Sequence, residues 1–574
     1  MVQPRRLLLL AIFLVALSGA RPAHAGGEID PVPAPANDAG WDIPGEFVVD
    51  LADDLEESEI TTLFRVFAVT AAPTALAAET RIYVVKFAPA RYSELLGRLA
   101  ADRRVELVEP HSQVRAAFVP DDPLLKEQWH LARVGAEHAW DFSTGRGVTV
   151  AVVDTGIACE DNGPFTKASD LAKTRCVAGY NFVGRNEHAN DDHGHGTHVA
   201  GTIAQSTNNA VGGAGVAFAG RLMPIKVLSA DGWGTTSDVA DGIRWAADHG
   251  AQVINLSLGG PRPSRVLQRA IDHARDKGVT VVAAAGNSAG RVEYPGGSRS
   301  VIGVSATTSD DKLAWFSSRG PGVDIAAPGV GVIQQTICNS GRDRCERFPS
   351  FSGTSMASPH VAGAAALLVS LGVTRPEAVE RALLGTAQAV GSPREFGAGI
   401  VAAAAALERA ALWHMLVRVL ALAVLVFVVF RSARRHGAQC SPWSPLFLIP
   451  AFATGPGLLF FAPFLLPRYV GGVDLLARPI GEWDLLFSAS LHGYLPLANA
   501  LIPFALTALL LSVRRLVPVL AGISVGTAAY LVSIVVLRDV ASPAGPLLLS
   551  AWAALNAVGC AALARLVLTS KDPS

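Results

Sequence analysis

Apolar and polar residues are arranged in two different ways along this chain, and the pattern changes near residue 411. Between residues 46 and 410, short apolar segments with the period of strands or amphipathic helices are separated by charged and turn-forming residues. After residue 411, long segments without Asp, Glu, Lys or Arg follow one another. These segments are Val419 to Phe430, Leu446 to Pro467, Leu485 to Val513, Leu516 to Leu537 and Val540 to Ala564.

The uncharged segments predict five transmembrane helices over residues 411–574. Four of them are long enough to cross a hydrocarbon core about 30 Å thick. The first becomes long enough only if it starts near Ala411 and includes Arg418, whose side chain would then reach the interface or face neighbouring helices. Buried helices of a soluble domain are the alternative, but five such segments in succession favour an all-α membrane bundle.

Basic residues follow every second predicted span, so they all lie on the same side of the membrane. They follow the first, third and fifth spans, at Arg431, Arg434 and Arg435, at Arg514 and Arg515, and at Lys571. Because Lys and Arg concentrate in cytoplasmic segments, these loops and the C-terminus are predicted to lie in the cytoplasm. The residues before the first span then lie outside, which makes the chain a multi-pass membrane protein.

The N-terminus predicts the same orientation. Arg5 and Arg6 precede an apolar stretch from Leu7 to Leu17, and Ala23-His24-Ala25 forms a small-x-small cleavage pattern. We predict a signal peptide over residues 1–25, with an uncleaved anchor as the alternative, and a linker over residues 26–45.

The exported part divides into two patterns. Residues 46–119 predict a small α+β domain with strands at 46–51, 81–87 and 105–108 and helices at 57–67 and 92–101. Residues 120–410 contain alternating strand and helix segments, at 148–153, 198–205, 222–227, 239–249, 253–256, 265–277 and 279–284. This alternation predicts a parallel sheet flanked by helices, with functional groups at the carboxyl ends of its strands.

The composition of the chain excludes some classes of function. Of 574 residues, 48 are Lys or Arg and 49 are Asp or Glu, so the net charge of −1 argues against a nucleic-acid partner. Only 17% of residues are charged, which is low for a wholly soluble chain. Four of the six cysteines form close pairs in the exported part, where disulfides persist, namely Cys159/Cys176 and Cys338/Cys345. Cys440 and Cys560 fall in the membrane part and are expected to be reduced, and no metal-binding cysteine spacing occurs.

Four chemically distinct residues stand beside glycines at strand or helix ends. They are Asp154 in Val-Asp-Thr-Gly, His195 in His-Gly-Thr-His, Asn287 in Ala-Gly-Asn, and Ser355 in Gly-Thr-Ser-Met-Ala. A serine hydroxyl becomes nucleophilic when an imidazole removes its proton, and a carboxylate fixes the tautomer of that imidazole. An amide and a helix N-terminus can stabilise the oxyanion that forms. Together these groups supply what peptide hydrolysis by a serine requires.

These motifs, in the order Asp, His, Ser, resemble those of subtilisin-like serine proteases (subtilases) with an inhibitor-type propeptide. The resemblance covers roughly Asp121 to Leu412 and the small domain before it, and it implies a subtilisin-like α/β fold after a ferredoxin-like prodomain. It further implies a protein or peptide substrate, no cofactor for catalysis, and a prodomain that acts as an intramolecular inhibitor and folding aid. His193, His198 and His360 are then structural. Asp191 and Asp192 are expected in a solvated loop, with cation binding as the alternative.

The resemblance also implies two finer sites. A structural calcium ion would be bound by Gln128, Asp170, Thr207, Asn209 and Val211. The walls of the substrate pocket would be Ser257, Leu258 and Gly259 on one side and Ala285 and Gly286 on the other. Glu293 would close the base of that pocket and favour Lys or Arg at P1, with a solvent-facing Glu293 as the alternative. Arg115 would then be a natural processing point.

Two functions remain open at this stage. The first is an exported, membrane-tethered serine endopeptidase that acts on exported or membrane-proximal proteins. The second is a membrane transporter or sensor that carries an accessory protease domain. Few polar groups occur within the predicted spans, which disfavours an ion pathway.

Overall fold

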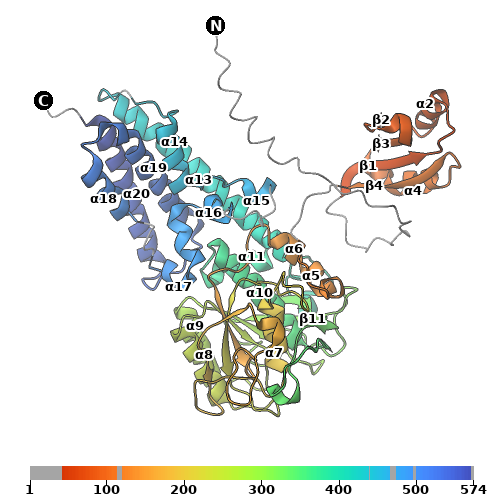
Figure 1. The fold of residues 1–574 in the computed structure, drawn as a ribbon, viewed down its shortest axis with the longest axis vertical. Coiled ribbons are helices and arrows are strands. Elements are labelled where there is room, and N and C mark those ends of the chain that lie inside the picture. The colour runs from red at the N-terminus through yellow and green to blue at the C-terminus, as the bar shows by residue number, and fades with distance from the viewer. Residues whose placement is uncertain (1–41, 113–118, 439, 466–472, 495–498, 571–574) are drawn as a thin grey trace, which may run out of the picture. The chain divides into compact units, whose positions relative to one another are not determined.

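The computed structural model describes residues 42–112, 119–438, 440–465, 473–494 and 499–570. The chain forms two compact units, Met1–Arg115 and Ala116–Ser574 (Figure 1). The predicted signal peptide, most of the predicted linker and the processing point at Arg115 lie outside the described residues.

The first unit contains a four-stranded antiparallel sheet in the order β2-β3-β1-β4. Its elements are β1 (Asp42–Leu51), α2 (Glu57–Val66), β2 (Thr70–Pro73), α3 (Ala77–Thr80), β3 (Ile82–Lys86), η2 (Pro89–Arg91), α4 (Tyr92–Ala100) and β4 (Val105–Ser112). Phe47, Val49 and Leu51 alternate along β1 and pack against apolar side chains of α2 and α4. The prediction of three strands was wrong, because β2 has only four residues, little apolar character and a terminal proline.

A parallel sheet organises the first part of the second unit, in the order β12-β11-β10-β9-β5-β8-β6. Its strands are β5 (Thr149–Asp154), β6 (Arg175–Cys176), β8 (Arg221–Lys226), β9 (Val253–Leu256), β10 (Thr280–Ala284), β11 (Ile302–Thr307) and β12 (Ile325–Pro328), and β7 (Tyr180–Asn181) pairs with β8. All residues of β5, β9, β10 and β11 are buried, as expected for a sheet covered on both faces. The predicted parallel sheet is therefore confirmed.

Helices cover the two faces of this sheet. The apolar residues of α7 (His195–Ala204) and α10 (Thr354–Leu371) form the core on one face. Those of α8 (Thr236–Asp248) and α9 (Arg265–Asp276) form the core on the other face. The remaining elements before residue 403 are η3 (Leu125–Glu127), α5 (Trp129–Val134), α6 (Ala136–Ala139), η4 (Ser169–Leu171), β13 (Val332–Ile333), η5 (Asn339–Gly341), β14 (Ser350–Phe351), α11 (Pro376–Leu384) and α12 (Pro393–Phe396).

A helical region completes the second unit. It contains α13 (Ala403–Arg434), α14 (Pro445–Thr454), α15 (Ala462–Leu465), α16 (Val473–Ala477), η6 (Ile480–Leu486), α17 (Ala489–His492), α18 (Leu501–Leu510), η7 (Arg514–Leu516), α19 (Val517–Leu537) and α20 (Pro546–Thr569). Among its described residues, three helical stretches are long and apolar enough to cross a membrane: α13, η7 with α19, and α20. A fourth such helix, α10, is 89% buried, and it lies in the core beside the parallel sheet.

Two of the five predicted spans are not continuous helices. α14 and α18 have ten residues each, which is about 15 Å of helix and half of a hydrocarbon core. α14 contains Pro450 and ends at Gly455. In the third predicted span, Leu485 and Ala489 are buried in the core that α7 and α10 form. These uncharged residues lie in a protein interior, and hydropathy alone does not distinguish such residues from those of a membrane span.

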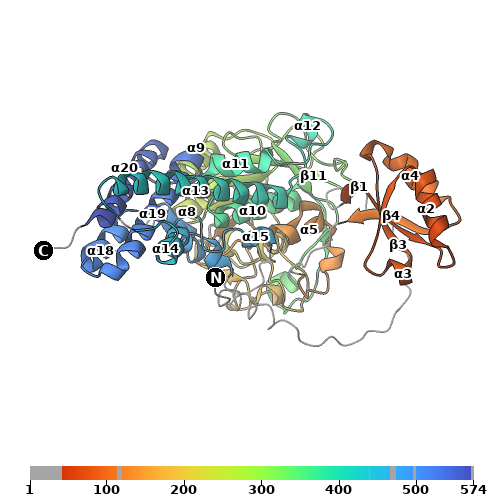
Figure 2. The ribbon, with the colours of Figure 1, turned by 90° about the horizontal axis from the view of Figure 1, so that it is seen from above.

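Buried polar contacts join elements of the helical region to one another and to the residues that follow α10. Arg418 of α13 forms an ion pair with Glu482 of η6, and both side chains are less than a tenth exposed. Nε2 of His414 lies 2.6 Å from Oδ2 of Asp539, whose backbone carbonyl accepts hydrogen bonds from the amides of Thr374 (2.9 Å) and Arg375 (2.8 Å). Of the two predicted environments for Arg418, the one facing neighbouring elements is correct. Figures 1 and 2 show α13 running without a break from the sheet-containing part into this region.

Candidate active site

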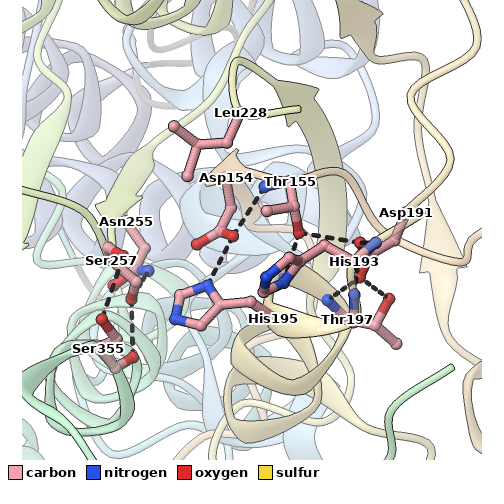
Figure 3. A network of polar contacts seen from close by, with 12 residues as sticks. Asp154, Thr155, Asp191, His193, His195, Thr197, Leu228, Asn255, Ser257 and Ser355 are labelled. Carbon is pink, nitrogen blue, oxygen red and sulfur yellow. Dashed lines mark hydrogen bonds and ion pairs between the residues drawn. The ribbon is translucent and has the colours of Figure 1, made fainter. Parts of the chain in front are cut away.

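Three elements bring the motif residues together at one edge of the parallel sheet (Figure 3). Asp154 is the last residue of β5, His195 is the first residue of α7, and Ser355 is the second residue of α10. β5 is hydrogen-bonded to β8 and β9, so its carboxyl end is fixed within the sheet. The N-cap residues just before the two helices are glycines, Gly194 and Gly353, which lack a side chain that would obstruct this edge.

His195 is paired with a buried carboxylate. Its Nδ1 lies 2.7 Å from Oδ1 of Asp154, which also accepts a 2.7 Å hydrogen bond from the backbone N–H of Thr155. Burial lowers the pKa of His195, but the charge and the hydrogen bond of Asp154 outweigh burial, so this pKa lies above its ordinary value. Because the carboxylate holds a proton on Nδ1, the neutral ring presents an unprotonated Nε2.

Ser355 lies on the side of the imidazole opposite Asp154. Figure 3 shows the second ring nitrogen of His195 on the side that faces Ser355. The Ser355 hydroxyl donates to the backbone carbonyl of Ser257 (3.2 Å), and the Ser257 hydroxyl donates in turn to the Ser355 carbonyl (2.8 Å). A hydrogen bond from the Ser355 hydroxyl to His195 would therefore replace the one to this carbonyl. Hydrogen bonds between catalytic groups are often long or absent in a free enzyme and form only when the substrate binds.

Asn287, which follows β10, is oriented through its oxygen. Its Oδ1 accepts hydrogen bonds from the backbone N–H (2.8 Å) and the hydroxyl (2.9 Å) of Thr354. Its Nδ2 lies 3.4 Å from the position that a Cβ on Gly353 would take. Among the described residues no acceptor binds this Nδ2 group, so it is available as a donor beside the N-terminus of α10.

Asp191 was predicted to lie in a solvated loop, and this prediction was wrong. Its side chain is fully buried and accepts hydrogen bonds from Thr155, His193, Gly194 and Thr197. These contacts fix the first turn of α7 and hence the position of His195. The signal in the sequence is an acidic residue just ahead of a helix, where it can accept hydrogen bonds from the free N–H groups of the first turn.

The neighbouring Asp192 is also bonded within the protein. Nζ of the buried Lys226 lies 2.6 Å from Oδ1 of Asp192, and it also donates to the carbonyls of Thr155 and Leu228. This lysine thus ties the residue after Asp154 to the loop ahead of His195. Sequence patterns did not single out Lys226, because its role depends on contacts between separate strands.

Two other histidines of the motifs are buried in the core. His198 bonds to backbone carbonyls of Val332 and Pro349, and burial lowers its pKa to about 3. His360 lies 2.8 Å from His130, and burial lowers its pKa to about 4. Both are therefore neutral near pH 7, which fits the structural role predicted for them.

A groove of about 650 Å³ begins at His195 and runs beside Ser257, Leu258 and Gly259. Glu293 lies next to Gly259 and Gly286, since a Cβ on Gly259 would be 3.0 Å from Oε2 of Glu293 and a Cβ on Gly286 would be 2.4 Å from its Cδ. The carboxylate thus lies between the two predicted pocket walls. Ala285 is buried next to Gly286 and accepts a 2.8 Å hydrogen bond from the N–H of Glu293. Among the described residues Glu293 forms no ion pair, so its charge is available.

The predicted calcium residues are brought together only in part. Asp170 is buried, and it accepts hydrogen bonds from Asn209 (2.8 Å), Gln205 and the N–H of Gly213 (3.1 Å). No positively charged side chain pairs with it in the described chain, and burial raises its pKa to about 7. Gln128 instead bonds through both ends of its amide to Ala214 and through Nε2 to Ile333.

Asp122 is a residue of this loop cluster that sequence reasoning missed. Its carboxylate accepts hydrogen bonds from the backbone N–H groups of Asn208 (2.7 Å) and Asn209 (3.2 Å), and its charge helps to raise the pKa of Asp170. Thr207 and Val211 lie in the same loop. The residue types gathered in this loop, two carboxylates, an amide and backbone carbonyls, are ligands of the kind that Ca²⁺ takes.

The two predicted cysteine pairs are disulfide-bonded. Cys159 pairs with Cys176 and Cys338 pairs with Cys345, with Cα–Cα distances of 6.0 and 5.1 Å. Cys440 and Cys560 are free. All four bonded cysteines lie in the part of the chain that was predicted to be exported.

Comparison with known proteins agrees with this geometry. The model of the Subtilase family matches residues 145–399. An extracellular protease of Xanthomonas campestris pv. campestris is 38% identical over 365 residues, which are 55% of this chain and 61% of that protein. Subtilisin Savinase of Lederbergia lenta is 43% identical over 281 residues, which are 48% of this chain and 97% of Savinase.

A solved structure of a protease from Pseudoalteromonas arctica is 34% identical and covers 51% of this chain and all of its own, with a TM-score of 0.47. The family match ends at residue 399, just before α13 begins. Because nearly all of Savinase is matched at well over 30% identity, the chain belongs to the subtilase family and is a subtilisin-like serine protease.

Proposed function

We propose that the protein is a membrane-anchored serine endopeptidase with Asp154, His195 and Ser355 as its catalytic triad and Asn287 as its oxyanion donor. The observation that carries this proposal is the 2.7 Å contact between Asp154 and His195, with the second nitrogen of the ring facing Ser355. The family relationship supports the reaction, and the contact supports these particular residues for it.

The geometry supports a two-step hydrolysis. Nε2 of His195 accepts the hydroxyl proton of Ser355 while the oxygen attacks the scissile carbonyl. Nδ2 of Asn287 and backbone N–H groups at the start of α10 donate to the oxyanion. The protonated His195, stabilised by Asp154, then donates its proton to the leaving amine. Water repeats these steps and releases the acyl group from Ser355.

The triad is tested by changing Ser355 alone. Ser355→Ala is expected to abolish peptide hydrolysis and labelling by a fluorophosphonate probe, while the thermal unfolding of the protein stays unchanged. If the accessory-protease alternative were correct, cells with this variant would keep the phenotype that loss of the whole gene removes. A variant that still hydrolyses peptide at a substantial rate would refute the assignment of Ser355.

We propose that the helical region anchors the protease in a membrane with its C-terminus in the cytoplasm. Support comes from the length and apolar composition of α13, α19 and α20, with α14 and α18 as short intervening helices. The free Cys440 lies in a connection predicted to be cytoplasmic, and Ala544 is exposed in the connection between α19 and α20, which lies outside in this orientation. A membrane-impermeant maleimide should label an Ala544→Cys variant in intact cells, but should label Cys440 only after lysis. The reverse pattern would refute this orientation.

We propose that residues 46–119 form the inhibitory prodomain. Apart from the short α3 and η2, the order of its elements is β-α-β-β-α-β with the sheet order β2-β3-β1-β4, which supports a ferredoxin-like fold. Maturation at Arg115 predicts a new N-terminus at Ala116 in the wild type and none in Ser355→Ala. Sequencing the N-termini of both proteins tests the site of cleavage.

Two finer features complete the proposal. Glu293, which lies between the pocket walls and has no ion-pair partner among the described residues, favours Lys or Arg at P1. The acidic cluster of Asp170 and Asp122, with Asn209 and the carbonyls of Thr207 and Val211, binds a structural calcium ion. Gln128 is left out of this ligand set because its amide is bonded elsewhere.

A further inference from the structure

A long groove lies between two helices of the helical region, away from the active-site edge. It has a volume of about 730 Å³ and is bounded by the second half of α13 and by α14 with the residues just before it. Its walls are apolar side chains that include Phe427, Phe430, Phe447 and Phe452. No acidic residue lines it within the described chain.

One end of this groove is strongly basic. Arg431, Arg434 and Arg435 line it together with Trp443, which is 80% exposed. The spacing of the three arginines places them on one face of the end of α13. The side chains of these three arginines form no hydrogen bond or ion pair with another described residue, whereas Arg565 nearby contacts His436. Three cations therefore converge on the groove without an internal counter-charge.

The dimensions of the groove match those of a lipid. Its lining runs from Val419 to Arg435 along α13, and sixteen helical steps correspond to about 24 Å. That length accommodates an extended acyl chain with a headgroup at the arginine end. A free inorganic anion would use only the arginines and would leave the apolar walls exposed.

We propose that this groove binds one anionic phospholipid, with an acyl chain between α13 and α14 and its phosphate beside Arg431, Arg434 and Arg435. The proposal rests on the membrane anchoring proposed above. Basic pockets between helices on the cytoplasmic side of a membrane suit anionic headgroups, whereas unspecific lipid contact needs neither the groove nor the cluster. We therefore expect the protease to carry a bound lipid and to bind lipids with anionic headgroups more tightly than lipids with neutral ones.

Trp443 provides a direct probe of occupancy. The full-length protein is reconstituted in phosphatidylcholine vesicles that contain a small fraction of lipid with brominated acyl chains, either phosphatidylglycerol or phosphatidylcholine. Fluorescence of Trp443 is taken as the difference between the wild type and Trp443→Phe. Brominated phosphatidylglycerol should quench it at a concentration at least about fivefold lower than brominated phosphatidylcholine, since each contacting arginine contributes a factor of about this size.

Two kinds of variant separate the contribution of the arginine charges from that of the apolar groove. The triple variant with Gln in place of Arg431, Arg434 and Arg435 should lose the preference, and Ala423→Phe should lose the quenching by filling the groove. The matched controls should retain both properties. They are the double variant with Gln in place of Arg514 and Arg515, which lie outside the groove, and Val424→Phe, which is one residue away on α13 and does not line it.

Each other outcome overturns the inference in a distinguishable way. Equal quenching by both brominated lipids means unspecific lipid contact only. Loss of quenching on addition of millimolar inorganic phosphate means that the arginines bind free anions instead. If the protein does not remain with the vesicles at all, the anchoring proposal fails, whereas retention without headgroup preference refutes only the lipid site.

Discussion

Replacement of Glu293 by Gln should remove most of a preference for basic P1 residues. The Glu293 carboxylate lies between Gly259 and Gly286, and a lysine that enters between these walls would bring its ammonium to about 4 Å from it. At an effective dielectric constant of about 20, two charges at this distance attract by about 4 kcal/mol. Glu293 is partly exposed, so about half of this value, or about 2 kcal/mol, is a reasonable expectation. That corresponds to a change of about 30-fold.

The assay compares kcat/KM for two peptides that differ only in Lys or Leu at P1. In Glu293→Gln the Lys-to-Leu ratio should fall by about 30-fold, mainly through the lysine substrate. Asp231 lines the same groove at another place, and Asp231→Asn serves as a control for long-range charge effects. An unchanged ratio in Glu293→Gln, or an equal fall in Asp231→Asn, would refute the reasoning that Glu293 acts locally at P1.

Four further perturbations have defined outcomes. Asn287→Ala should lower kcat by about 100- to 1,000-fold with little change in KM, since its amide acts mainly in the transition state; a parallel change in both constants would contradict this role. The pKa of His195 is raised, and in the proposed mechanism its neutral form is the base. As the pH decreases, kcat/KM of the enzyme should therefore fall with a midpoint above pH 6.5. A midpoint below pH 6.5 would contradict the pairing with Asp154. The folded-state pKa of Asp170 is raised from 3.8 to about 7, so the calcium-free protein should lose thermal stability as the pH rises from about 4 through about 7. Calcium should restore this stability in the wild type, whereas Asp170→Asn, which cannot ionise, should show neither the loss with rising pH nor the stabilisation by calcium. Glu482→Gln leaves Arg418 buried without a counter-charge and should lower unfolding free energy by about 3 kcal/mol, whereas replacing both residues by Met should cost less; unfolding in detergent measures both.

The residues of the proposed active site could be selected from the sequence because each of them lies in a local motif. Asp154 ends an apolar strand, and His195 and Ser355 begin helices after glycines, so chain order and flanking residues were sufficient to select them. The supporting residues were not predictable in this way. Lys226 acts through contacts with residues from other elements, which leave no pattern in its own segment, and the contact of Asp191 with Thr155 is equally invisible there, although its acidic position ahead of α7 is a local signal.

The loop cluster around Asp170 shows the same limit. Gln128 was assigned to it by similarity of sequence, but the described structure directs its amide toward Ala214 and Ile333. Asp122 approaches the loop instead, because the segment before α5 passes beside Asn208 and Asn209. Which of two nearby polar residues reaches a site depends on the path of the backbone, and spacing along the chain does not reveal that path.

The order of apolar and polar residues alone determined that this chain has a parallel sheet flanked by helices and a strongly apolar C-terminal region. Local periodicity suffices for this, because it decides which face of a strand or helix avoids water. Only the tertiary structure decided where each apolar residue is buried. Leu485 and Ala489 belong to uncharged sequence, yet they pack in the core beside α10, and the charged Arg418 is buried because Glu482 lies opposite. Hydropathy records the preference of a residue for leaving water, whereas the folded chain decides whether lipid, protein or an opposite charge takes the place of water.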